Sequence, residues 1–165
     1  MTKYLFLIAY SVCSQFAFGQ NTNFTVKEID SIVKQIDSTC ISAGIIDYIF
    51  HKKGPWKKTI GGGADWFYTD TSGAKLLKAV RETSLASEGI DIYYFYNDSL
   101  IYLKISNGPY RDDKIKITWR AQYYFQNSNL IFKQGELNFV FNPKRYLETA
   151  RQFFSPEQIW RRGNK

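Results

Sequence analysis

The stretch Tyr93–Lys104 reads YYFYNDSLIYLK, and thirty residues further on Tyr123–Gln134 reads YYFQNSNLIFKQ. Each stretch places an aromatic run before a polar pair and an apolar run after it. The pairs Asn97-Asp98 and Asn127-Ser128 suit the positive φ angles of a two-residue β-turn. The sequence therefore predicts two copies of one unit, an aromatic β-hairpin with a tight polar turn.

Regular pairing outward from these turns predicts the cross-strand neighbours. In the first hairpin the expected pairs are Tyr96–Ser99, Phe95–Leu100, Tyr94–Ile101, Tyr93–Tyr102 and Asp91–Lys104. In the second they are Phe125–Leu130, Tyr124–Ile131, Tyr123–Phe132 and Gln122–Lys133. Hairpins placed side by side extend an antiparallel sheet, and several of them with a covered face are stable where one alone is not. We therefore expect both hairpins in one sheet.

Alternation along the strands predicts which faces are apolar. One face of the first hairpin carries Ile90, Ile92, Tyr94, Ile101, Leu103 and Ile105, and the other carries Tyr93, Phe95, Leu100 and Tyr102. Two apolar faces mean either that helices of the same chain cover this hairpin twice, or that an aromatic face meets a partner. The strand leading into the second hairpin alternates cleanly, and its predicted solvent side is Lys114, Lys116, Thr118, Arg120, Gln122 and Tyr124.

Amphipathic helices are predicted at both ends of the domain. Thr25 and Glu28 have the spacing of a capping box. An apolar stripe follows at helical spacing, and it consists of Val26, Ile29, Ile32, Val33, Ile36 and Cys40. Near the other end, Asn142 is the expected cap of a helix whose first residue is Pro143, the position that favours proline. Both stripes need an apolar sheet face to pack against.

The segments between these elements complete the fold prediction. Strands are expected at 45–50 and at 75–81, with turn residues at 70–73 and a last short strand within ELNFVF from Glu136. The glycines of GGG, residues 61–63, are expected to form a flexible connection. The fold class is α+β: an antiparallel meander of about seven strands, built from repeated aromatic hairpins and packed by an N-terminal and a C-terminal helix.

The chain length predicts the number of domains, and the first residues predict where the protein is located. The 165 residues suit one domain. Residues 1–19 have the pattern of a signal peptide, with Lys3, an apolar run and small residues before a cut after Gly19. Residues 20–165 then form the domain, exported to the periplasm or the extracellular space. A lipidated Cys13 and an uncleaved N-terminal helix are the alternatives. Cleavage removes Lys3 and changes the net charge from +7 to +6.

Catalytic and metal-binding motifs are not found in the sequence. It has no CxxC, HExxH, P-loop or GxSxG pattern. Cys40 is the only cysteine after cleavage, which rules out an internal disulfide, and it is expected to be a buried structural thiol. With His51 the only histidine, a metal site is not expected, and we expect neither a cofactor nor catalytic residues. The carboxylates that a hydrolase would need cannot be placed from sequence, and the candidates are Asp65, Asp91, Asp112, Asp113 and Glu136.

The segment HKKGPWKK is the most distinctive polar stretch. Its basic residues surround a tryptophan, and the candidate ligand-binding set is His51, Lys52, Lys53, Trp56, Lys57 and Lys58, with Tyr93 and Tyr102 of the aromatic face. Basic side chains hold anions, and an exposed indole can stack on a sugar. A solvated loop with the indole in the core is the alternative interpretation. In an exported protein, the expected partner is an anionic glycan, a lipid headgroup or an envelope protein, and not nucleic acid.

The combination of FAFGQ, VKEIDSIVKQID and the repeated YYF…N…LI hairpins resembles small exported proteins of the Gram-negative cell envelope whose role is unassigned. The resemblance implies an exported domain without a membrane span after cleavage, and it supplies no catalytic residues. Our leading hypothesis is a non-enzymatic binding or interaction module. The alternatives are a secreted hydrolase that uses carboxylates, and an inhibitor or assembly subunit that acts through a sheet edge.

Overall fold

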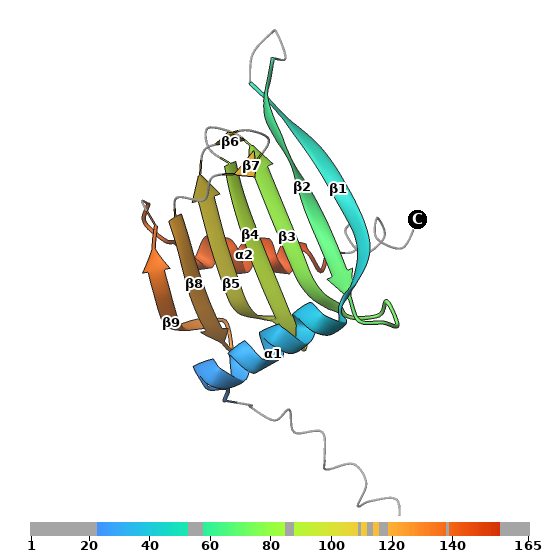
Figure 1. The fold of residues 1–165 in the computed structure, drawn as a ribbon, viewed down its shortest axis with the longest axis vertical. Coiled ribbons are helices and arrows are strands. Elements are labelled where there is room, and N and C mark those ends of the chain that lie inside the picture. Colours follow the sequence, from blue (N-terminus) through green and yellow to red (C-terminus); the bar gives the residue numbers. More distant parts are fainter. Residues whose placement is uncertain are drawn as a thin grey trace, which may run out of the picture.

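The computed structural model describes residues 23–52, 58–84, 88–108, 110–111, 114–115, 119–137 and 139–155. Seven strands form one antiparallel sheet in the order β1-β2-β3-β4-β5-β8-β9 (Figure 1). They are β1 (Ile41–His51), β2 (Thr59–Thr69), β3 (Leu76–Ser84), β4 (Glu88–Tyr96), β5 (Ser99–Gly108), β8 (Trp119–Gln126) and β9 (Asn129–Glu136). Between β5 and β8, the short strands β6 (Tyr110–Arg111) and β7 (Lys114–Ile115) pair with each other. The predicted meander is confirmed.

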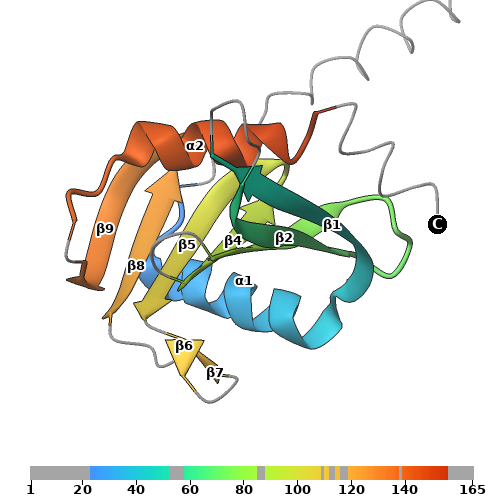
Figure 2. The same ribbon diagram turned by 90° about the horizontal axis from the view of Figure 1, so that it is seen from above.

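Two helices lie on opposite faces of the sheet, α1 (Val26–Thr39) on one and α2 (Pro143–Gln152) on the other (Figure 2). Both predicted caps are confirmed. The Glu28 N–H donates to Thr25 Oγ1 at 3.3 Å, and the Thr25 N–H donates to Glu28 Oε2 at 2.7 Å. At the start of α2 the Asn142 side chain accepts from a backbone N–H, and Pro143 opens the helix. Each capped end satisfies donors that the helix itself leaves free.

The core has two layers because both faces of the sheet are covered. Under α2, the buried cluster includes Phe67, Ala79, Tyr93, Phe95, Leu103, Phe125, Tyr146 and Phe153. Under α1, it consists of Ile29, Ile36, Tyr94, Ile101, Tyr102 and Tyr124. The first hairpin, β4–β5, therefore lies in the middle of the sheet with its own helices on both sides, which was the first of the two alternatives. Each large side chain buried there stabilises the fold by about 1.5–3 kcal/mol.

The two hairpins share a turn that was predicted and a bulge that was not. Asn97 and Asp98 have φ angles of 47° and 58°, and Asn127 and Ser128 have 50° and 63°. In both hairpins the register then shifts by one residue. The observed pairs in the first are Phe95–Leu100, Tyr94–Tyr102, Tyr93–Leu103 and Asp91–Ile105, and in the second Phe125–Leu130, Tyr124–Phe132, Tyr123–Lys133 and Gln122–Gln134.

The predicted pairs Tyr96–Ser99, Phe95–Leu100 and Phe125–Leu130 are confirmed, and the bulge corrects the predicted pairs further from each turn, including Asp91–Lys104. Each hairpin contains one extra residue that has no partner on the opposite strand, and these residues are Ile101 and Ile131. As a result Ile101 and Tyr102, adjacent in sequence, both lie in the cluster under α1, while Leu103 joins the cluster under α2. Strict alternation had placed Leu103 with Ile101. The bulge buries all three side chains.

The prediction that Tyr124 faces solvent is wrong. Tyr124 is 3% exposed under α1, and its hydroxyl donates to Asp30 Oδ1 at 2.9 Å. Asp37, two turns further along the helix, accepts from the Tyr94 hydroxyl at 3.0 Å and forms an ion pair with Lys78 at 2.8 Å. The carboxylates that lie beside the apolar stripe of α1 therefore hold the helix on the tyrosines of the sheet.

Of the predictions for three further segments, one is confirmed and two are wrong. The strand at 75–81 is confirmed as β3, and the turn before it is closed by Asp70 Oδ1, which accepts from the Ala74 N–H at 2.9 Å. The glycines at 61–63 do not form a flexible connection, because they lie inside β2. No strand forms in the described part of ELNFVF beyond Glu136, and Val140 there is 93% exposed.

The glycines inside β2 have a packing role. A Cβ added at Gly63 would lie 2.7 Å from the aromatic ring of Tyr48 on β1. Because the ring crosses the strand at this point, its hydroxyl reaches the Glu82 carbonyl oxygen on β3 at 3.3 Å. Gly63 therefore permits a close approach between neighbouring strands and is not a hinge.

Candidate functional site

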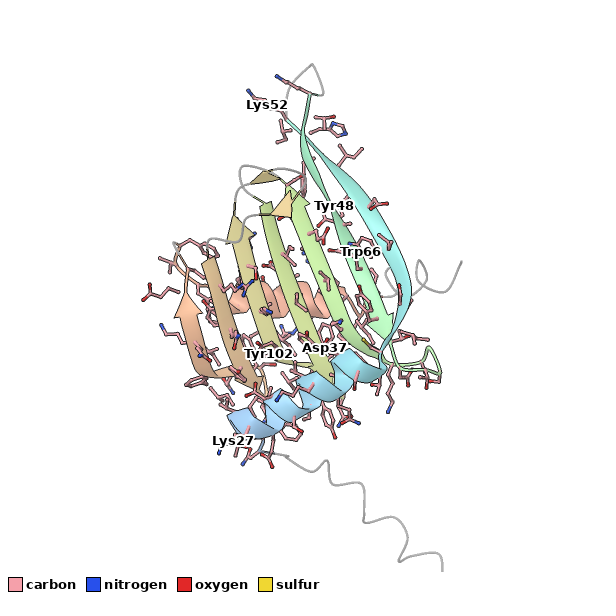
Figure 3. All side chains as sticks on the ribbon, in the orientation of Figure 1. Lys27, Asp37, Tyr48, Lys52, Trp66 and Tyr102 are labelled. Carbon is pink, nitrogen blue, oxygen red and sulfur yellow. The ribbon has the colours of Figure 1, made fainter. Side chains whose placement is uncertain are left out.

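The basic segment lies at the end of the long hairpin formed by β1 and β2. This hairpin extends beyond the rest of the sheet, and Lys52 lies near its tip (Figure 3). His51, Lys52 and Lys58 are exposed there, and the Lys52 N–H donates to the Lys58 carbonyl at 2.8 Å. Lys53, Trp56 and Lys57 lie outside the described residues. The three candidate positions that are described, His51 and two lysines, lie exposed together at one tip.

Tyr93 and Tyr102, the two aromatic candidates, lie in the core. They are 1% and 6% exposed, Tyr93 under α2 and Tyr102 under α1. Tyr93 packs edge-on against Phe153, with ring centroids 5.1 Å apart. Burial raises the pKa of Tyr102 to about 12. Because the helices of the chain cover both rings, we leave them out of the proposed site.

A row of charged side chains crosses three strands on the face that α2 covers. Asp65 on β2, Arg81 on β3 and Asp91 on β4 are neighbours in register. Arg81 donates two hydrogen bonds to Asp65, each 2.7 Å long, and its guanidinium lies 5.0 Å from the ring centroid of Phe153. The Asp65 side chain is 4% exposed. Such a two-bond pair fixes the position and orientation of the Asp65 side chain.

Asp91 is the carboxylate of this row that Arg81 does not bind directly. Among the described residues no side chain donates a hydrogen bond to it. Burial raises the pKa of Asp91 to about 6, against the opposing effect of Arg81 and Arg145. The structure therefore brings Asp65 and Asp91, which sequence could not place, to the two sides of one arginine.

The third feature is the edge strand β9, where apolar side chains are left uncovered. All eight of its residues are exposed. Leu130, Ile131 and Phe132 are 37%, 42% and 45% exposed. Their counterparts in the first hairpin, Leu100, Ile101 and Tyr102, are 6%, 4% and 6% exposed. The same residue types that form the core in β5 thus form a surface in β9, where no described strand pairs with the outer edge.

A pocket lies beside β9 where the chain turns back toward α2. Its volume is about 490 Å³. It is lined by apolar residues together with Lys133, Glu136 and backbone polar groups, and the lining consists of Tyr123, Leu130, Lys133, Gly135, Glu136, Leu137, Phe139, Val140, Phe141 and Pro143. Lys133 and Glu136 are its charged groups, and Glu136 lies opposite Arg120 in register. Among the described residues neither Lys133 nor Glu136 forms an ion pair, so this pocket combines apolar residues with one charged group of each sign.

Sequence reasoning missed this edge because the two hairpins were treated as equivalent. The signal that distinguishes them is in the repeat itself. Position 103 is leucine, and the matching position 133 is lysine. A position as fully buried as Leu103 does not accept an unpaired lysine, whereas lysine on an edge strand discourages unspecific pairing.

Comparisons with models of known protein families, with curated proteins and with solved structures found no match to this chain. In the described part of the chain, neither helix is long and apolar enough to cross a membrane. The same residues include no group of three or more His, Cys, Asp or Glu side chains that could hold a metal ion.

Proposed function

We propose that this protein is an exported, non-enzymatic interaction module that binds a protein partner along the outer edge of β9. One observation carries the proposal. Leu130, Ile131 and Phe132 keep the core residue types of β5 but are about 40% exposed on an unpaired strand. Apolar side chains exposed on both faces of an edge strand, next to backbone donors and acceptors that no described strand pairs, are typical of a site for another chain. Export rests on the pattern of residues 1–19.

Binding of an anionic glycan or a lipid headgroup at the basic tip is a second candidate. It is supported by the exposure of His51, Lys52 and Lys58 at the end of a projecting hairpin. Charge reversal of Lys52, Lys53, Lys57 and Lys58 is expected to abolish retention of the protein on an anionic polysaccharide column. Unchanged retention would exclude this candidate.

The carboxylate row gives less support to a hydrolase. Glycoside hydrolysis uses two carboxyl groups on opposite sides of a bond. Asp65 is already bound by Arg81 through two hydrogen bonds, so it is not free to act as a base or nucleophile. Asp91 alone, with a pKa near 6, does not complete such a pair.

The proposed function can be tested by capture from the organism's envelope extract. The bait is the purified protein, compared with Ile131→Asp on β9 and with Ile49→Asp on β1. Ile49 is the matched control, since it is an isoleucine on the opposite edge strand and is 64% exposed. We expect the wild type and Ile49→Asp to retain the same protein, and Ile131→Asp to lose it. Equal capture by all three folded proteins would refute binding at β9.

A further inference from the structure

The repeated hairpin provides a template for the missing neighbour of β9. β5 pairs with β4 on one side and with β8 on the other. β9 pairs with β8 as β5 pairs with β4, with the same turn and the same one-residue bulge. The outer edge of β9 is therefore the counterpart of the edge of β5 that β8 occupies. The strand that fits this edge should resemble β8 in direction and in pattern.

We propose that an extended segment of a partner protein adds to β9 as an antiparallel strand, with an apolar residue opposite Phe132 and an acidic residue opposite Lys133. This inference rests on the proposed function and specifies its partner. In strand addition, backbone hydrogen bonds supply the affinity, while the alternate side chains supply the specificity. The sheet of this protein would then gain an eighth strand from another chain.

The register of the template fixes which residues meet. β8 places Tyr124 opposite Tyr102 and Tyr123 opposite Leu103. Transferred to the second hairpin, these pairs put one residue of the incoming strand opposite Phe132 and the preceding residue opposite Lys133. The first lies on the face that α1 covers, since Tyr102 packs there. The second lies on the α2 face, since Leu103 packs there.

The charge of Lys133 determines the chemistry of the second position. Leu103 is fully buried, whereas its counterpart Lys133 is exposed, lines the 490 Å³ pocket and has no ion pair among the described residues. An incoming side chain opposite Lys133 therefore enters the mouth of that pocket beside a cation. A carboxylate is favoured there over an apolar group or a second cation, because opposite charges across neighbouring strands attract and like charges repel. The surrounding apolar wall, which includes Phe139 and Val140, is available for the stem of that side chain.

A second copy of this chain fits the edge less well. Antiparallel pairing of β9 with itself over its full length would place Leu130 opposite Gly135, Ile131 opposite Gln134 and Phe132 opposite Lys133. In each of these three pairs a large apolar side chain would lie opposite glycine or a polar side chain. A partner with its own complementary pattern avoids this mismatch.

The test uses two synthetic peptides built on the β8 sequence WRAQYYFQ. In one, glutamate replaces the first tyrosine, which is the residue that aligns with Lys133, and in the other lysine replaces it. Affinities are measured by fluorescence anisotropy at low salt, and amide hydrogen exchange of residues 129–136 is followed in parallel. We expect the glutamate peptide to bind about tenfold more tightly than the lysine peptide. We also expect binding to slow amide exchange in β9.

Charge reversal at the pocket provides the decisive comparison. Lys133→Glu should invert the preference, so that the lysine peptide binds more tightly. Lys34→Glu on the exposed side of α1 makes the same change in net charge and should leave the preference unchanged. An unchanged preference in Lys133→Glu, or binding without protection of β9 amides, would overturn the proposal. So would a dimer in sedimentation velocity that Ile131→Asp abolishes.

The outcomes also separate this inference from the proposed function. If neither peptide binds but capture from the extract still depends on Ile131, the partner uses the β9 surface without adding a strand, and only the inference fails. If capture is also independent of Ile131, both fail.

Discussion

Replacement of Asp91 by asparagine should stabilise the protein at neutral pH and remove part of its pH dependence. Asp91 lies on β4 next to Arg81, but the guanidinium is already bound by Asp65 through two hydrogen bonds of 2.7 Å. The charged form of Asp91 is therefore partly buried without a hydrogen-bond donor among the described residues, and loss of solvent is the main cause of its raised pKa. Asparagine has almost the same shape and no charge.

The size and the sign of the effect follow from the pKa. A rise from 3.8 to about 6 makes the folded state the stronger proton binder between those two pH values. The free energy of unfolding therefore falls as the pH rises through that window, and the loss is complete above about pH 6. With about 1.4 kcal/mol for each pKa unit, the loss is about 3 kcal/mol. Asp91→Asn should gain roughly that amount at pH 7 and little at pH 4.

Urea denaturation followed by far-UV circular dichroism at intervals from pH 4 to pH 8 measures this directly. Glu28 and Asp70, whose pKa values are lowered by backbone hydrogen bonds, act with the opposite sign in both proteins. The difference between wild type and Asp91→Asn therefore isolates Asp91. Asp47→Asn, at an exposed position on β1, is the control. A difference curve that is flat with pH, or that rises toward low pH, would refute the argument.

Three further predictions concern packing and can be checked by the same urea titrations at pH 7. Gly63→Ala should destabilise the fold by more than about 2 kcal/mol, since its Cβ meets an aromatic ring, whereas Gly44→Ala, with no atom within 4 Å, should be nearly neutral. Thr69→Val should stabilise by up to about 1 kcal/mol, because the Thr69 hydroxyl is buried without a hydrogen-bond partner among the described residues. Tyr124→Phe should cost about 1–2 kcal/mol, because it removes the hydroxyl that donates to Asp30. A stability equal to wild type in Gly63→Ala or Tyr124→Phe, or a less stable Thr69→Val, would contradict the corresponding contact.

The elements that sequence predicted correctly are those determined by local chemistry. The polar pairs at 97–98 and 127–128 adopt positive φ angles because asparagine tolerates them. The capping box at Thr25 forms because its partners are three residues apart. The order of the hairpins in the sheet follows from short connections, since consecutive strands usually pair. These features do not depend on what packs against them.

The elements that sequence could not predict are those determined by distant neighbours. The extra residue at Ile101 is invisible in a pattern of alternation, because both possible registers leave apolar residues on both faces. Alternation placed Tyr124 on the same side as polar residues such as Arg120 and Gln122, so its burial could not be predicted. Its hydroxyl is satisfied by Asp30, which comes from a helix almost a hundred residues earlier. The glycines at 62 and 63, which resemble a flexible segment in the sequence, are explained by close contacts with Tyr48 on β1 and with the Glu82 carbonyl on β3.

The candidate site at β9 also depends on where a local sequence pattern lies in the sheet. The second hairpin copies the first closely enough to reproduce its turn and its bulge, yet it lies at the edge of the sheet rather than at the centre. A copy with only a scaffold role would be expected to lose its outer apolar residues, because exposed ones promote aggregation. Leu130, Ile131 and Phe132 keep apolar side chains at the positions of Leu100, Ile101 and Tyr102, while lysine replaces the central leucine at position 133. Retained apolar side chains together with a lysine in place of the buried leucine favour a specific neighbour over an open edge, and the preference for an acidic residue opposite Lys133 tests this directly.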